Sequence, residues 1–280
     1  MEVVQSVDFA YSASGFVVGL LVGLTGVGGG SLMTPLLILL FGVHPATAVG
    51  TDLLYAAATK TGGSLVHGLN RTIDWVIVRR LAWGSVPTTA LTLIVLSWFS
   101  VSSPTTRQLI TLALGIVLFL TAASLIFRQQ IVAFYSARAR DITPQQTARL
   151  TILVGAVLGV LVSISSVGAG AIGVTALILL YPNLPAVRIV GSDIAHAVPL
   201  TLVAGLGHWL LGSVDMHILS ALLVGSLPGI MCGSLMSFRM RESALRVVLA
   251  LALIVAGTRL ITQSYPDSSA VASATEQKKN

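Results

Sequence analysis

Cysteine, charge and aromatic side chains are scarce in this chain of 280 residues. Its single cysteine, Cys232, excludes a disulfide within the chain and lies in an apolar stretch, which favours a packing role over a redox or metal role. Charged residues make up only 9% and hydrophobic residues 55%, a composition outside the range of soluble domains and typical of polytopic membrane proteins. The net charge of +6 lies in short loops between apolar segments, so it indicates a membrane protein rather than a nucleic-acid-binding one.

Enzymatic features are also missing. The sequence has no cluster of metal ligands and no nucleophile with an adjacent base at a recognisable spacing. We therefore expect no cofactor, no bound metal and no enzymatic activity. The expected surroundings are membrane lipid.

One apolar stretch, residues 16–41, is interrupted by the segment Gly26-Val-Gly-Gly-Gly-Ser31. As a continuous helix it would be about 40 Å long, more than the hydrocarbon core of about 30 Å. Glycine is unfavourable inside helices, so this segment predicts a break at membrane depth. Two half-helices, Phe16–Thr25 and Leu32–Phe41, would meet there.

The same arrangement returns in the second half of the chain. The segment Gly159–Ala171 matches the sequence from Gly19 onward at an offset of 140 residues, and after a one-residue insertion Val49–Leu53 matches Val190–Ile194. Further matched pairs are His67 with His208, Asp74 with Asp215, and Pro87 with Pro228. An internal duplication in a membrane protein is typical of secondary transporters, whose sites lie near the midplane where the repeats meet.

These patterns predict an all-α polytopic membrane protein with two inverted repeats, each a broken (re-entrant) helical hairpin plus three transmembrane helices. Whether each hairpin is re-entrant or two short crossings stays open. The expected segments are an N-terminal segment 1–13, a first repeat 14–127, a cytoplasmic linker 128–148, a second repeat 149–262 and a disordered tail 263–280. The expected spans are 46–68, 76–99 and 106–127, then 189–211, 218–236 and 244–262.

Basic residues set the expected orientation. Most of the 16 Lys and Arg residues fall on one face if each hairpin enters and leaves on the same side, and the positive-inside rule makes that face cytoplasmic. Both termini are then periplasmic. The loop at 71–80 is basic while its counterpart at 212–220 has no Lys or Arg, as inverted repeats require.

The two breaks are the expected binding site. Non-helical backbone at membrane depth must be buried in protein or line a cavity, and the half-helix that starts there presents free N–H groups and a positive dipole end. Such ends suit oxyanions, although close helix packing is the alternative use of small residues. The candidate ligands are the backbones of Gly28, Gly29, Gly30, Ser31, Gly168, Ala169, Gly170 and Ala171, with hydroxyls of Thr25, Ser31, Ser165 and Ser166.

Ionisable residues in apolar spans mark functional pathways by default. Asp52 and Asp193 either carry a proton or hold the structure, and the structural role is favoured because a permanent negative charge would oppose anion binding. Lys60 either attracts the anion or neutralises Asp52. His67 and His208 lie near span ends, where an interfacial role is favoured over coupling or gating. Asp74 and Asp215 precede apolar runs as helix N-caps would.

Three motifs together resemble the sulfite exporter TauE/SafE family over residues 14–262. They are Gly26-Val-Gly-Gly-Gly with a following Pro35, His44-Pro-Ala-Thr-Ala-Val-Gly-Thr51, and His67-Gly68 ahead of Ile73-Asp-Trp75. The resemblance implies a multi-pass permease for anionic sulfur compounds in the bacterial inner membrane. Its glycine motif corresponds to Gly26–Gly30 and, weakened, to Gly168 and Gly170. Where many members have Ser after Gly-Thr, this chain has Asp52, with Asp193 in the other half.

The sequence thus predicts a secondary transporter that moves sulfite, a sulfonate or thiosulfate by alternating access, with or without protons. Thr51, Asp52, Ser192 and Asp193 would form the shell around the backbone ligands. An anion channel and a permease for a non-sulfur organic anion are the alternatives, and a membrane scaffold is the alternative from another class. Direction of transport, coupling ion and oligomeric state are left open.

Overall fold

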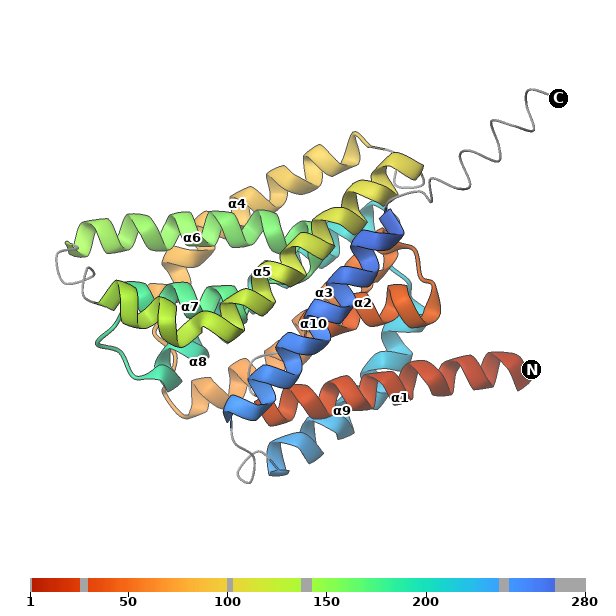
Figure 1. The fold of residues 1–280 in the computed structure, drawn as a ribbon, viewed down its shortest axis with the longest axis horizontal. Coiled ribbons are helices and arrows are strands. Elements are labelled where there is room, and N and C mark those ends of the chain that lie inside the picture. Colours follow the sequence, from red (N-terminus) through yellow and green to blue (C-terminus); the bar gives the residue numbers. More distant parts are fainter. Residues whose placement is uncertain (1, 26–29, 100–102, 137–142, 237–241, 265–280) are drawn as a thin grey trace.

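The computed structural model describes residues 2–25, 30–99, 103–136, 143–236 and 242–264. Within these residues the chain forms ten α-helices and no strand (Figure 1). The helices are α1 Glu2–Thr25, α2 Gly30–Phe41, α3 Pro45–Leu69, α4 Trp75–Ser97, α5 Pro104–Ser136, α6 Pro144–Ser165, α7 Ala171–Leu180, α8 Ala186–Leu210, α9 Met216–Met236 and α10 Glu242–Ser264.

In the described part of the chain, four segments are long and apolar enough to cross a membrane by length and composition: Thr105–Val132, Pro144–Ser165, Ala186–Leu210 and Met216–Gly233. α3 and α4 have 25 and 23 residues, also a full crossing at 1.5 Å per residue. Each carries two charged residues, Asp52 and Lys60 in α3 and Arg79 and Arg80 in α4. The prediction of an all-helical polytopic membrane protein is confirmed.

The first arm of each hairpin is longer than expected. α1 has 24 residues where a half-helix of residues 16–25 was predicted, and α6 has 22 residues. The N-terminal residues of α1 include polar side chains, so they form helix without contributing to the apolar pattern. α2 and α7, with 12 and 10 residues, are the short members of the two hairpins.

The expected linker 128–148 is partly helical. α5 continues to Ser136, and α6 already begins at Pro144. A capping box starts α6: the Thr143 hydroxyl accepts from the Gln146 N–H at 3.3 Å, and the Gln146 side chain accepts from the Thr143 N–H at 2.9 Å. At the other end of the chain, α10 runs to Ser264, and the expected tail beyond it lies outside the described residues.

Equivalent helices of the two halves make equivalent contacts. α1 packs on α9 with Gly15 against the backbone of Leu222, and α6 packs on α4 with Gly155 against the backbone of Leu81. The next turn repeats the pattern, with Gly19 on Ser226 and Gly159 on Ser85. The first helix of each half therefore packs on the fourth helix of the other half. A side chain at any of these glycines would meet backbone, which explains the choice of glycine there.

Two helix pairs cross between the halves and run antiparallel. In the α3–α8 pair, Gly50 lies against His208 while Gly191 lies against His67, so the start of each helix meets the end of the other. The helices of the α5–α10 pair lie side by side (Figure 1), with Gly115 against Ile261. Antiparallel pairing of equivalent helices is the geometry that inverted repeats need. Which end of the bundle faces the cytoplasm stays a prediction.

The short helices α2 and α7 are enclosed by longer ones. Met33 and Leu37 of α2 are fully buried in a cluster with Leu114 of α5 and Leu253 of α10. In the other half, Leu177 of α7 is buried in a separate cluster with side chains of α4 and α8. Protein therefore covers one face of each short helix, as backbone breaks at membrane depth require, while Leu40 near the end of α2 is exposed.

Candidate functional site

The break between α6 and α7 is built from residues in unusual backbone conformations. Ser166 ends α6 with a φ of 58°, and Gly168 and Gly170 follow with φ of 112° and 123°. Residues with a side chain rarely adopt the backbone conformations of Gly168 and Gly170, so both positions require glycine. α7 then starts at Ala171, and its first backbone hydrogen bonds are donated by Gly173 and Val174. The N–H groups ahead of them form the positive end of this helix.

The equivalent break in the first half, residues 26–29, lies outside the described residues, and with it the candidates Gly28 and Gly29. Gly30 and Ser31 are the first two residues of α2. Pro35 lies inside α2 as its sixth residue rather than the fourth helical position that the sequence predicted. The helix begins two residues earlier than expected, so Pro35 lies beyond the first turn.

Lys60 brings a cation to the second break. This α3 side chain is only 7% exposed, and its Nζ lies 3.5 Å from the carbonyl oxygen of Ala169, between the two glycines. Lys60 also interacts electrostatically with both buried carboxylates, more strongly with Asp193 than with Asp52. The sequence had left open whether it attracts an anion or neutralises Asp52, and the structure places its Nζ at the second break.

Asp52 is tied to the first turn of α2. Its Oδ2 accepts from the Thr34 hydroxyl at 2.5 Å and from the Thr34 backbone N–H at 3.2 Å. The carboxylate is fully buried, and its Oδ1 has no hydrogen-bond partner among the described residues. Donors at this distance favour the ionised form of a buried carboxyl group. Asp52 therefore joins α3 to the start of α2.

Asp193 occupies the equivalent place in the second half. It is 2% exposed, and its Oδ1 lies against Gly173 in the first turn of α7, where any Cβ would collide with it. This oxygen is buried and has no hydrogen-bond partner in the described part of the chain. Each aspartate thus faces the first turn of the short helix of its own half, but only Asp52 finds donors there.

Thr51 and Ser192 point elsewhere, toward the loops of the opposite half. The backbone N–H of Asp215 donates to the Thr51 hydroxyl at 3.0 Å, and that of Asp74 donates to the Ser192 hydroxyl at 2.8 Å. Both aspartates cap their helices as predicted: Asp74 accepts from Val76 N–H at 3.0 Å, and Asp215 does the same at the start of α9. The two hydroxyls therefore bind the loop ahead of each fourth helix.

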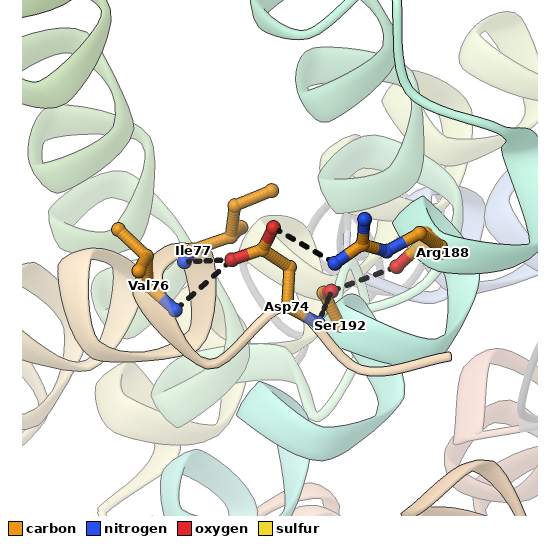
Figure 2. A network of polar contacts seen from close by, with 5 residues as sticks. All are labelled: Asp74, Val76, Ile77, Arg188 and Ser192. Atoms are coloured by element: carbon orange, nitrogen blue, oxygen red, sulfur yellow. Dashed lines mark hydrogen bonds and ion pairs between the residues drawn. The ribbon is translucent and has the colours of Figure 1, made fainter. Parts of the chain in front are cut away.

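One end of the bundle has an additional ion pair (Figure 2). Asp74 Oδ2 lies 3.3 Å from the Arg188 guanidinium, and Ser192 donates to the Arg188 carbonyl at 2.7 Å. Arg80 donates to the hydroxyl of Tyr181 at 3.1 Å near the same end. The loop before α4 and the loop before α8 therefore lie at one end of the bundle, together with Arg80 and Arg188.

His67 and His208 lie at the C-terminal ends of α3 and α8. His67 Nδ1 is 2.8 Å from the Thr72 hydroxyl, and His208 Nε2 is 2.9 Å from the Ser163 carbonyl. Each packs on a glycine of the other half. Fifteen residues separate Asp52 from His67, about 22 Å along a helix, so the structure does not bring the histidines to the carboxylates of their own helices.

Comparison with known proteins assigns the chain to a family. The family model described as "Sulfite exporter TauE/SafE" matches residues 11–260. The chain belongs to the TauE/SafE family. A protein of Bacillus subtilis (strain 168) named "Probable membrane transporter protein YjnA" is 42% identical over 88% of this chain and 97% of its own length. No solved structure matches the chain.

The matches to two further relatives cover nearly the whole length of each relative. "Probable membrane transporter protein YdhB" of Bacillus subtilis (strain 168) is 27% identical over 88% of this chain and 97% of its own length. A "Probable membrane transporter protein" of Xylella fastidiosa (strain 9a5c) is 27% identical over 90% of this chain and 94% of its own length. Together with the apolar helices, the family identifies this chain as a multi-pass membrane transporter.

In this TauE/SafE protein, sequence analysis missed His196. The side chain is fully buried one turn after Asp193, its Nε2 lies 2.8 Å from the Ser85 hydroxyl, and it interacts electrostatically with Lys60. The repeat contained a signal for it. Tyr55, one turn after Asp52, is the matching residue at an offset of 141, and its hydroxyl is likewise buried.

Proposed function

We propose that this protein is a secondary transporter for a small sulfur-containing anion such as sulfite, a sulfonate or thiosulfate. The family is named for sulfite export, and the relatives are named as membrane transporters. Bacterial relatives and the basic loops support the inner membrane, with the end that carries Arg188 and Asp74 in the cytoplasm and both termini in the periplasm.

The observation that carries the proposal is the buried ammonium of Lys60 at the break before α7. A buried cation is costly unless it is paired, and here it adjoins the N–H groups at the start of a helix. An oxyanion would interact with both. The backbone of Gly168–Ala171 and the Lys60 Nζ would bind it, and the buried Ser166 hydroxyl would complete the shell.

The first-half ligands are proposed by symmetry. Gly28–Ser31 would bind the same anion or its second charge from the opposite side, with Asp52 holding α2 in place through Thr34. Thr51 and Ser192 would act on the anion only indirectly, because their hydroxyls bind the loops of the other half. His67 and His208, which pack between the halves, belong to the gating contacts rather than to the anion shell.

Alternating access would use the exchanged interfaces. The α1–α9 and α6–α4 pairs repeat the same contacts, so motion of one half relative to the other can exchange the environments of the two ends. The ion pair of Arg188 with Asp74 is present at one end. The residue matching Arg188 is Thr47, which cannot form an ion pair with Asp215. Opening one end therefore breaks an ion pair that the other end lacks.

Flux of radiolabelled sulfite into proteoliposomes tests the function, with thiosulfate, a sulfonate, phosphate and a carboxylate as competitors. We expect saturable flux with counterflow that sulfur anions inhibit. Flux without saturation or counterflow would indicate a channel, and inhibition by the carboxylate alone would indicate a different organic anion. Sulfite flux should be lost in Lys60→Met and partly kept in Lys60→Arg, because only the second variant retains the cation.

A scaffold would behave differently. Gly29→Leu places a large side chain at the first break, which a scaffold would tolerate and an anion site would not. Unchanged sulfite flux in a folded Gly29→Leu protein would refute the proposed site.

A further inference from the structure

We propose that Asp193 is the group that binds and releases the transported proton, while Asp52, its counterpart in the first half, stays ionised throughout the cycle. This inference rests on the proposed function of anion transport. It assigns different tasks to two residues that the internal repeat makes equivalent.

The hydrogen bonds of the two carboxylates differ. Asp52 accepts two hydrogen bonds from Thr34, from the hydroxyl and from the backbone N–H. Asp193 faces Gly173, which offers no hydroxyl, and no hydrogen bond to its carboxylate is present among the residues described. Donors stabilise the ionised carboxylate, whereas a buried carboxylate without donors is costly. By hydrogen bonding, Asp193 takes a proton more readily than Asp52, against the opposing effect of Lys60, which interacts more strongly with Asp193.

The charges around Asp193 come from few residues. α3 contributes Lys60, which also interacts electrostatically with Asp52 of the same helix. α8 itself contributes His196 one turn away. The neighbouring helices α7, α6 and α4 contribute Gly173, Leu158 and Ser85 at this level, none of which titrates. Lys60 is thus the one cation that balances two carboxylates in this part of the described structure.

The charge balance links anion and proton. With both carboxylates ionised, Lys60 leaves the centre with a net charge of −1, which repels an entering anion. Once Asp193 Oδ1 takes a proton from water at the open end, Lys60 and Asp52 balance each other and the centre accepts the anion. The anion and the proton leave together when the other end opens, and the proton returns to water as Asp193 ionises again. The transported unit is one anion with one proton, moving in the same direction.

Infrared spectroscopy of the full-length protein in lipid tests the proton site directly. As pH is lowered, a carbonyl band of a protonated carboxylic acid should appear in the wild type and in Asp52→Asn, and should be missing in Asp193→Asn. His196→Gln is the control for the other buried titratable side chain and should keep the band. If Asp193→Asn does not fold, Asp193→Glu replaces it, and the band should shift in frequency there. A band that disappears in Asp52→Asn instead, or no band at all, would overturn the assignment.

Accumulation of thiosulfate in proteoliposomes tests the coupling, because thiosulfate carries no titratable proton near neutral pH. With the membrane potential clamped, one proton per anion gives up to about tenfold accumulation per pH unit. Asp193→Asn should exchange thiosulfate by counterflow but lose this accumulation, while variants of Asp52 that still transport should keep it. Gradient-driven accumulation in Asp193→Asn would refute the coupling. If wild-type protein moves no anion while the infrared band behaves as expected, the proposed function fails and the proton site stands.

Discussion

The Ser192 hydroxyl on α8 accepts a hydrogen bond over 2.8 Å from the backbone N–H of Asp74, the residue that caps α4 in the other half (Figure 2). The matching pair, Thr51 and Asp215, repeats this bond at 3.0 Å with the halves exchanged. A hydroxyl in the middle of one repeat thus fixes the start of a helix in the other. Such bonds couple the two halves at both ends of the α3–α8 pair.

Removing the Thr51 hydroxyl tests that coupling. Thr51→Ala leaves the backbone N–H of Asp215 without its acceptor, and an unsatisfied buried donor costs about 1–3 kcal/mol. Thr51→Ser keeps the hydroxyl and serves as the control. We expect Thr51→Ala to lower the midpoint of thermal unfolding in detergent clearly more than Thr51→Ser. Equal midpoints for the two variants would show that the hydrogen bond does not stabilise the fold.

Much of the fold could be predicted because its information is local or repeated. Apolar segments mark the helices, and the Asp74 and Asp215 caps lie next to the N–H groups that they bind. The repeat offset aligned residues that the structure then places equivalently, such as Gly19 and Gly159. The start of α6 was missed although a local signal existed, since Thr143 and Gln146 form a capping box.

The site depends on contacts that no local pattern contains. Ser192 and Asp74 are 118 residues apart, and Lys60 meets Ala169 across 109 residues. The matched hydroxyl and carboxylate residues therefore predicted one shell around the anion. In the structure the hydroxyls contact loops of the other half and the carboxylates face the short helices. The sequence also does not reveal that Asp52 has hydrogen-bond donors and Asp193 has none among the described residues, because this depends on which residue of α2 or α7 each carboxylate faces.

The bond between Thr34 and Asp52 predicts a large loss of stability when the hydroxyl is removed. A hydrogen bond to a charged group contributes about 1.5–3 kcal/mol, so Thr34→Val should destabilise the protein by that amount. Thr34→Ser keeps the donor and should cost less. In an Asp52→Asn background the penalty of Thr34→Val should shrink, because the charged acceptor is gone. Additive losses in this double-mutant cycle, measured by thermal unfolding, would contradict the interaction.

Glycines at the exchanged interfaces predict equal sensitivity in the two halves. Gly15→Ala and Gly155→Ala each place a methyl group against the backbone of the facing helix, which overpacking data put at about 1–3 kcal/mol. Gly62 is the matched control, since it is exposed in α3 and no atom lies near its added Cβ. Gly62→Ala should leave stability unchanged or raise it by up to about 1 kcal/mol through helix propensity. Unfolding midpoints that fall for only one of the two interface variants would argue against equivalent roles.

The last prediction concerns orientation. The ion pair of Arg188 with Asp74 places the loops that contain Asn70 and Asn183 at one end of the bundle, and the antiparallel α3–α8 pair places the start of α9 at the other. Single cysteines at the exposed positions Asn70, Asn183 and His217, in a Cys232→Ser background, report on both ends. An impermeant maleimide added to intact cells should label only His217→Cys, because the proposed orientation puts the basic end in the cytoplasm. Labelling of Asn70→Cys and protection of His217→Cys would reverse the orientation, and labelling of all three from one side would refute the inverted arrangement itself.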